Sequence, residues 1–182
     1  MGYQILSFLL DVAAGLLGGT CLLRLYMQYQ RVPFGNPVGR FVFALTDWIV
    51  LPLRRILPAI RRVDTASLVA AFLIQLLQVV LLWLVAGRPG APALLPLLAL
   101  FELLRLVVSA LTALVIVYAV LSWVNADSPM ADVVDRLCAP LLRPWRRLIP
   151  LVGGIDLSPL AFLVVLQVIS IVLASLQASA LH

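Results

Sequence analysis

Four apolar stretches divide this chain, and each is long enough to cross the hydrocarbon core of a bilayer, which takes about 20 residues. They run over residues 3–26, 65–86, 94–124 and 157–181. Of the 182 residues, 64% are hydrophobic and only 12% are charged. A soluble domain of this size cannot bury so much apolar surface. The sequence therefore predicts an all-α membrane protein with four transmembrane helices.

Arginine is distributed unevenly among the segments that join these spans. Ten of the 13 arginines lie in the two long loops, whereas the short hairpin between the second and third spans holds only Arg88. Basic residues collect in the cytoplasmic loops of membrane proteins. The pattern predicts that both long loops are cytoplasmic and that both termini lie outside the cytoplasm. The same rule accounts for the net charge of +5, so we expect no nucleic-acid partner.

A shift of 92 residues aligns the two halves of the chain without a gap. Each half then reads P-x-R-R-x-x-P-x(5)-D. The shift places Pro52, Arg54, Arg55, Pro58 and Asp64 on Pro144, Arg146, Arg147, Pro150 and Asp156. The sequence thus predicts two tandem repeats, residues 1–92 and 93–182. Because each repeat holds two spans, the copies should enter the membrane in the same direction, as parallel repeats.

A segment with apolar residues at helical spacing precedes the basic motif in each repeat. This periodicity predicts an amphipathic helix at the cytoplasmic interface, with packing onto the bundle or a partner protein as the alternative. The apolar positions are Val38, Phe41, Val42, Leu45 and Ile49 in the first repeat and Met130, Val133, Val134, Leu137 and Leu141 in the second.

The basic motif should form a short turn, because proline interrupts helices and restricts the preceding residue. We expect stiff elbows over residues 52–58 and 144–150. They would present their arginines to anionic headgroups, at about 1 kcal/mol for each basic residue, or to a protein partner. These arginines are Arg54, Arg55, Arg146 and Arg147.

An aspartate directly precedes the second and the fourth span. Asp64 and Asp156 suit a helix N-cap and the positive end of the helix dipole. A sharper hypothesis is that each carboxylate also pairs with an arginine doublet, either in its own repeat or in the other.

A few polar residues fall within the spans, where charged groups are costly and usually face the bundle or water. The spacing of Glu102 and Arg105 lets them meet on one helix face. We expect Asp11 to join them in a cluster, with the alternative that Asp11 lies at the interface and extends its carboxylate to water. Gln75 and Gln167 occupy equivalent positions in the two repeats. They are expected to hydrogen-bond across the pseudo-twofold axis or to line a polar path. Arg24, near the inner end of the first span, should extend its guanidinium to the interface.

Residues for metal or nucleophilic chemistry are scarce. The two cysteines, Cys21 and Cys138, belong to no CxxC motif, and the one histidine is the last residue, His182. We therefore expect no metal, no cofactor and no enzymatic activity.

The duplicated motif resembles the YggT family of bacterial inner-membrane proteins and is similar to their plastid and cyanobacterial relatives. The matching residues are Asn36, Pro37, Thr46, Pro52, Arg54, Arg55, Pro58 and Asp64, then Pro129, Cys138, Pro144, Arg146, Arg147, Pro150, Asp156, Ser158 and Pro159. The resemblance implies a multi-pass protein of the bacterial inner (plasma) membrane. It also implies a link to osmotic or cation homeostasis, to genes of the division region or, in plastids, to cytochrome b6 haem assembly. It supplies no catalytic residue.

Two functions follow as hypotheses. The first is a scaffold or biogenesis factor, which recruits a membrane-protein partner or anionic lipid through the basic elbows. The alternative is a small channel or transport accessory that uses the polar residues within the spans. Because four spans seldom enclose a pore, the alternative would require a homo-oligomer.

Overall fold

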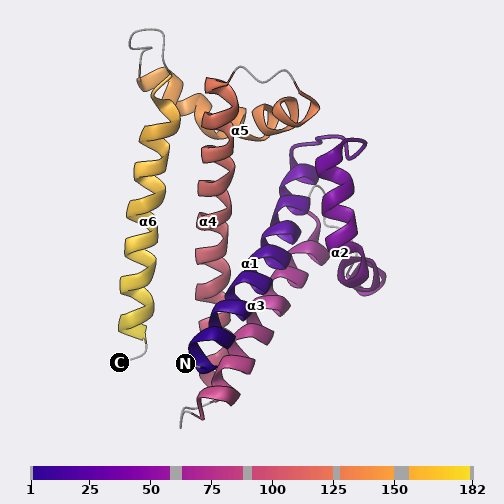
Figure 1. Cartoon of the computed structure of the whole chain (residues 1–182), viewed down its shortest axis with the longest axis vertical. Coiled ribbons are helices and arrows are strands. Elements are labelled where there is room, and N and C mark those ends of the chain that lie inside the picture. The colour runs from indigo at the N-terminus through magenta and orange to yellow at the C-terminus, as the bar shows by residue number, and fades with distance from the viewer. Residues whose placement is uncertain (1, 58–62, 88–91, 125–127, 150–155, 181–182) are drawn as a thin grey trace.

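The computed structural model of the chain is built from helices (Figure 1). It describes residues 2–57, 63–87, 92–124, 128–149 and 156–180. In chain order the elements are α1 (Gly2–Tyr29), α2 (Pro37–Ile56), α3 (Thr65–Ala86), the short 3₁₀ helix η1 (Pro92–Leu94), α4 (Leu95–Trp123), α5 (Pro129–Leu148) and α6 (Ser158–Ala180). By length and hydropathy, α1, α3, α4 and α6 can each cross a membrane. The predicted four-span helical fold is confirmed.

The spans form two pairs, one from each repeat. α1 packs against α3 and α4 packs against α6, while α4 also contacts α1 and α3 and so joins the pairs. The two chain ends lie at one end of the molecule, and α5 crosses the opposite end (Figure 1). This arrangement agrees with the predicted parallel topology, in which each copy is a span, an amphipathic helix and a second span.

The amphipathic helices begin with the same capping arrangement in both copies. Asn36 precedes α2 and its side-chain oxygen accepts a hydrogen bond from the Gly39 amide at 2.8 Å. Ser128 precedes α5 and its hydroxyl accepts from the Ala131 amide at 3.1 Å. Proline follows each cap, where its missing N–H costs little. Asn36 and Ser128, which are 92 residues apart, therefore act as equivalent N-caps.

Gly39 allows the chain to fold back tightly at the start of α2. A Cβ atom built at this position would lie 2.2 Å from the carbonyl oxygen of Phe34. Real atoms do not approach so closely, and the neighbour is backbone, which cannot rotate away. Position 39 therefore requires glycine, whereas its counterpart in the second copy is Ala131.

The expected proline elbows are wrong at their first residue, because the helices continue through it. Pro52 lies inside α2 and Pro144 inside α5, and α5 holds Pro140 as well. All three prolines are exposed. Each removes one helical hydrogen bond, but a carbonyl left free on an exposed face can be hydrated. The arginine doublets consequently occupy the last helical turns, not turns between helices. Pro58 and Pro150 lie outside the described residues.

One face of each amphipathic helix packs onto the bundle. Val42 of α2 and Leu137 of α5 are buried in a shared cluster with Met27 of α1. The alternative of packing on protein therefore holds for this face. Phe41 and Trp48 of α2 remain exposed, at 52% and 63%, so packing on protein accounts for only part of the apolar surface of this helix.

The two copies differ in one equivalent tyrosine. The hydroxyl of Tyr26 donates to the Leu137 carbonyl at 2.8 Å and so links the first repeat to α5 of the second. Tyr118, its counterpart 92 residues later, instead accepts a hydrogen bond from Arg146 of its own repeat. The duplicated hairpins are therefore joined asymmetrically.

A candidate functional site between the two repeats

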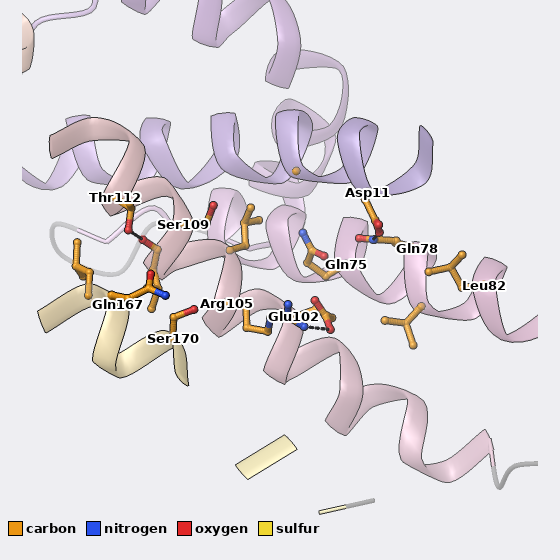
Figure 2. A pocket seen from close by; sticks show the side chains of 15 residues that line it. Asp11, Gln75, Gln78, Leu82, Glu102, Arg105, Ser109, Thr112, Gln167 and Ser170 are labelled. Carbon is orange, nitrogen blue, oxygen red and sulfur yellow. Dashed lines mark hydrogen bonds and ion pairs between the residues drawn. The ribbon is translucent and has the colours of Figure 1, made fainter. Parts of the chain in front are cut away.

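A cavity of about 700 Å³ lies between the repeats, and all four spans contribute to its wall (Figure 2). Most of its lining residues are polar, although the helices that supply them are strongly apolar. The polar lining residues are Asp11, Gln75, Gln78, Glu102, Arg105, Ser109, Thr112, Gln167 and Ser170. Such groups are expensive in hydrocarbon unless they face one another or water. Their gathering in one cavity marks this as the candidate functional site.

The cavity lies near the middle of the spans. Gln75 and Gln167 are ten and nine residues from the starts of α3 and α6. At about 1.5 Å per residue, each is roughly 15 Å from that end of its helix. A hydrocarbon core is about 30 Å thick, so these amides stand close to its midplane.

Glu102 and Arg105 form the ion pair expected from their spacing. Nη1 of Arg105 lies 3.3 Å from Oε1 of Glu102. The amide of Gln177 on α6 completes the group, because it donates to Glu102 at 3.1 Å and accepts from Arg105 at 3.5 Å. This contact joins α4 to α6 within the second repeat.

Asp11 lines the same cavity but does not join that pair, so the expected cluster is wrong in this respect. Its carboxylate accepts a hydrogen bond from the side-chain amide of Gln78 at 2.5 Å. The reason is the packing of α1 against α3, which places Gln78 beside Asp11 (Figure 2). With one arginine and two carboxylates, the lining carries a formal charge of −1.

Gln75 and Gln167 both face the cavity, but the expected hydrogen bond between them is not formed. Within the described residues neither side chain makes a hydrogen bond, although Gln75 is only 3% exposed. Of the two roles expected for these amides, lining a polar path agrees with their placement. Their free donors and acceptors are available to a bound molecule.

Three residues of this polar group, Gln78, Ser170 and Gln177, were not predicted from the sequence. A signal existed for the first two, since Gln78 and Ser170 are 92 residues apart and each follows an equivalent glutamine by three residues. Residues three apart share a helix face, so both pairs point the same way. No comparable signal marks Gln177.

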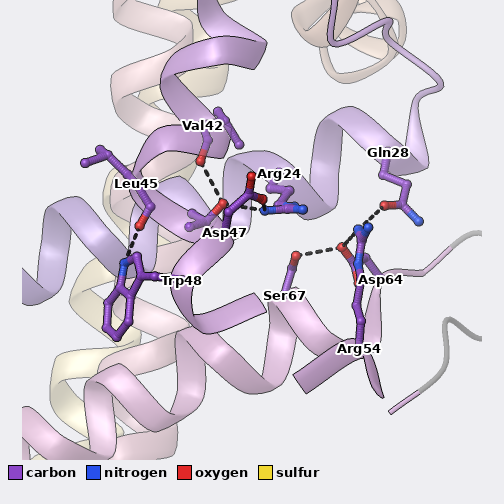
Figure 3. A network of polar contacts seen from close by, with 10 residues as sticks. Arg24, Gln28, Val42, Leu45, Asp47, Trp48, Arg54, Asp64 and Ser67 are labelled. Carbon is purple, nitrogen blue, oxygen red and sulfur yellow. Dashed lines mark hydrogen bonds and ion pairs between the residues drawn. The ribbon is translucent and has the colours of Figure 1, made fainter. Parts of the chain in front are cut away.

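At the end of the spans that α5 crosses, an arginine from each doublet is held by the aspartate of its own repeat, as Figure 3 shows for Arg54 and Asp64 of the first repeat. In the first repeat both carboxylate oxygens of Asp64 accept from Arg54, with Nε at 3.3 Å from Oδ1. Arg54 also donates to Gln28 at 2.9 Å, and Ser67 donates to Asp64 at 2.7 Å. The ion pair hypothesised from the sequence is therefore present and ties α2 to the start of α3.

The second repeat has the same pair in a more open setting. Nε of Arg146 lies 2.8 Å from Oδ2 of Asp156, and Arg146 also contacts the Tyr118 hydroxyl and ring. Oδ1 of Asp156 accepts from the Ser158 amide at 2.9 Å. Asp156 thus satisfies a free amide at the start of α6, as predicted. The same prediction is wrong for the Asp64 side chain, which makes no capping hydrogen bond to α3 and instead accepts from the Ser67 hydroxyl and from Arg54.

Both carboxyls are held in the charged form. Burial raises the pKa of Asp64, but the hydrogen bonds from Arg54 and Ser67 outweigh it and bring the pKa below its ordinary value. The pKa of Asp156 is lowered in the same way, against a burial effect, by hydrogen bonds from Ser158 and Arg146. The two ion pairs are therefore intact at neutral pH.

Arg24 does not extend to the interface as expected, because its side chain is 2% exposed between α1 and α2 (Figure 3). Its Nη1 donates to the Thr46 hydroxyl and to Asp47, both at 2.7 Å. The guanidinium also stacks over Phe43, at 4.8 Å from the ring centre. Asp47 and Phe43 supply nearby partners on α2, and these replace the route to water.

Comparison with known sequences assigns the chain to a family. The sequence model of the CCB3/YggT family matches it in two segments, residues 3–85 and 97–177. The chain belongs to the CCB3/YggT family. It is 37% identical over 169 residues to the "uncharacterized protein YggT" of Escherichia coli K12, with 91% of this chain and 87% of that one covered.

Two further bacterial proteins are similar to this CCB3/YggT chain over most of its length. An uncharacterized protein of Vibrio alginolyticus is 32% identical over 166 residues, with 89% of each chain covered. One from Pseudomonas aeruginosa is 36% identical over 152 residues, with 81% of this chain and 77% of that one covered. None of these names states an enzymatic activity, and no solved structure matches the chain.

The two matched CCB3/YggT segments coincide with the two hairpins of the structure, so the tandem repeat inferred from the 92-residue shift is confirmed. Among the described residues, each copy holds one arginine of the doublet in an ion pair and leaves the next exposed, namely Arg55 and Arg147. Within the same residues, no three histidine, cysteine or acidic side chains gather as a metal site would require.

Proposed function

We propose that this protein is the membrane-embedded binding unit of a cation transport system and that the cavity between its repeats holds a hydrated monovalent cation. The observation that carries the proposal is the cavity itself, about 700 Å³ in volume and lined by ionisable and amide side chains from all four spans. Ionisable groups at this depth are retained for function more often than for stability.

The character of the lining supports a monovalent cation. Its formal charge is −1, and the free amides of Gln75 and Gln167 offer carbonyl oxygens as ligands. A divalent ion such as Ca²⁺ or Zn²⁺ would require more carboxylates or nitrogen and sulfur ligands close together. A water molecule takes up about 30 Å³, so the cavity has room for an ion with its hydration shell.

Cation flux and binding measured on purified protein in liposomes test this proposal. We expect K⁺ or Na⁺ to stabilise the protein and to cross the bilayer, and both effects should weaken in Asp11→Asn, which keeps the side-chain volume but removes the charge. Gln75→Leu should act in the same direction. Asp132→Asn, on the exposed side of α5 and outside the cavity, serves as the control. Equal behaviour of Asp11→Asn and wild type would rule the proposal out.

A recruiting role remains as a second candidate, because one arginine of each doublet is free to serve it. Arg55 and Arg147 are exposed in the last turns of α2 and α5 and make no ion pair with any described residue. Their partner would be anionic lipid, a membrane protein or a second copy of this chain. Crosslinked pull-down from native membranes should lose its products in the double variant Arg55→Ala, Arg147→Ala. Unchanged products would exclude this role.

The orientation follows from the arginine distribution. We infer a place in the bacterial inner membrane, with α2 and α5 on the cytoplasmic side and both termini outside. The position of α5 opposite the chain ends supports this topology (Figure 1).

A further inference from the structure

A second, smaller pocket of about 340 Å³ lies where α1 ends, against the side of α5. Its charged lining consists of Arg31 from the first repeat and Asp135, Arg136 and Arg143 from the second. It is separate from the cavity between the spans, and neither Arg55 nor Arg147 lines it. The site therefore depends on neither function proposed above.

The three arginines of this pocket have no side-chain partner among the residues that the structure describes. Each is exposed, and none donates a side-chain hydrogen bond or forms an ion pair with any residue that the structure describes. Together with Asp135 they give the pocket a formal charge of +2. Arg54 and Arg146, by contrast, are each paired with an aspartate.

The register of α5 directs two of these arginines to the same place. Arg136 and Arg143 are seven residues apart, which is close to two helical turns, so their side chains leave the helix on one face about 10 Å apart. The end of α1 brings Arg31 to that face. Three guanidinium groups from both repeats thus surround one volume.

Arg31 has a backbone conformation that residues other than glycine rarely adopt. α1 ends in a Schellman motif, with the Arg31 amide bonded to the Gln28 carbonyl at 3.1 Å and the Val32 amide bonded to the Met27 carbonyl at 2.9 Å. The motif puts Arg31 at φ 55°, in the left-handed region. Glycine is the usual residue at this position, and a residue with a Cβ is disfavoured.

We propose that this pocket binds a phosphate group, carried by the headgroup of an anionic phospholipid or by a soluble phosphate. Guanidinium groups match the geometry of phosphate oxygens and bind them through paired hydrogen bonds. The pocket lies at the end of the spans that α5 crosses (Figure 1), which is the depth of headgroups in a bilayer. Asp135 is the acceptor for a hydroxyl group beside the phosphate, such as the glycerol of phosphatidylglycerol.

The backbone conformation of Arg31 allows a variant that removes the guanidinium without destabilising the fold. Arg31→Gly removes the guanidinium and places the residue best suited to φ 55°, so the unliganded variant should be at least as stable as wild type. Arg143→Ala removes a second guanidinium from the other repeat. Arg40→Ala, an exposed arginine of α2 outside the pocket, is the matched control.

Binding would be measured by titrating detergent-solubilised full-length protein with short-chain phosphatidylglycerol and, separately, with inorganic phosphate. We expect Arg31→Gly and Arg143→Ala each to bind about fivefold more weakly than wild type, the effect of one basic residue, and Arg40→Ala to bind normally. Binding of the lipid alone assigns the site to headgroups, and binding of both probes assigns it to phosphate in general. Wild-type binding by both pocket variants, an equal loss in Arg40→Ala, or no binding of either probe would overturn the proposal.

Discussion

Nη1 of Arg24 lies 2.7 Å from Oδ1 of Asp47, and this contact ties the first span to the amphipathic helix that follows it. The two partners differ in their surroundings, since the arginine side chain is 2% exposed and the aspartate side chain 42%. Separation of the pair therefore affects them unequally.

Removal of the aspartate should be the more damaging change. Asp47→Ala leaves a buried guanidinium without its carboxylate, and we expect a loss of about 2 kcal/mol in the free energy of unfolding. Arg24→Met replaces the guanidinium by an apolar side chain of similar length and leaves Asp47 hydrated. The loss in the free energy of unfolding should therefore be below about 1 kcal/mol. Thermal unfolding in detergent would compare the two variants. A greater loss in Arg24→Met would contradict this account.

The tight start of α2 makes a sharp prediction at one glycine. Gly39→Ala forces a methyl group against the Phe34 carbonyl, and overpacking of this kind costs about 1–3 kcal/mol. The reverse change at the equivalent position, Ala131→Gly, should cost no more than about 1 kcal/mol, the difference in helix propensity. Unfolding temperatures of the two variants test the asymmetry, which equal losses would disprove.

The ion pair between Arg54 and Asp64 predicts how the stability of the protein depends on pH. The pKa of Asp64 is lower in the folded than in the unfolded protein. The contribution of its charge to the free energy of unfolding is therefore complete above the unfolded pKa, near 4, and is lost as the pH falls through the folded pKa. Asp64→Asn should therefore reduce stability by about 1.5–3 kcal/mol at pH 7, and the gap to wild type should narrow below about pH 4.

The equivalent aspartate provides the comparison. The Asp156 side chain is 26% exposed, whereas that of Asp64 is fully buried. Asp156→Asn should cost about 1 kcal/mol or less at pH 7, as expected for an ion pair that water reaches. A gap for Asp64→Asn that stays constant down to pH 3 would show that the carboxylate charge contributes nothing.

Introduced cysteines can report the topology, because the native thiols should not react. Cys21 and Cys138 are both fully buried, and burial raises the pKa of Cys138 to about 12. We expect Arg55→Cys to resist a membrane-impermeant maleimide in intact cells and to react once the inner membrane is permeabilised. Gln4→Cys should react in intact cells. The opposite pattern would invert the proposed orientation.

The spans, their pairing and the duplication could be predicted from the sequence because they follow from patterns that extend over many residues. Apolar length defines α1, α3, α4 and α6, and a constant shift identifies the repeat. The Arg54–Asp64 contact was also accessible, since ten residues separate the two side chains and the shift showed the same spacing in Arg146 and Asp156.

Contacts between helices could not be predicted in the same way. The partners of Arg24 and Asp11, namely Asp47 and Gln78, depend on which helices pack together and on their rotation. Local rules also failed where tertiary structure overrides them, as at Pro52, which lies on an exposed face of a continuous helix. The pocket that Arg31 forms with Arg136 and Arg143 could not be predicted from the sequence, because it combines residues from both repeats.

Tyr26 and Tyr118 show that the two copies have ceased to be interchangeable. The Tyr26 hydroxyl donates to the Leu137 carbonyl of the other hairpin, whereas the Tyr118 hydroxyl accepts from Arg146 of its own hairpin. A rearranged gene encoding the second copy before the first would still produce two hairpins. Such a gene would remove the direct connection from the end of the first copy to the start of the second. We therefore expect the permuted chain to assemble poorly.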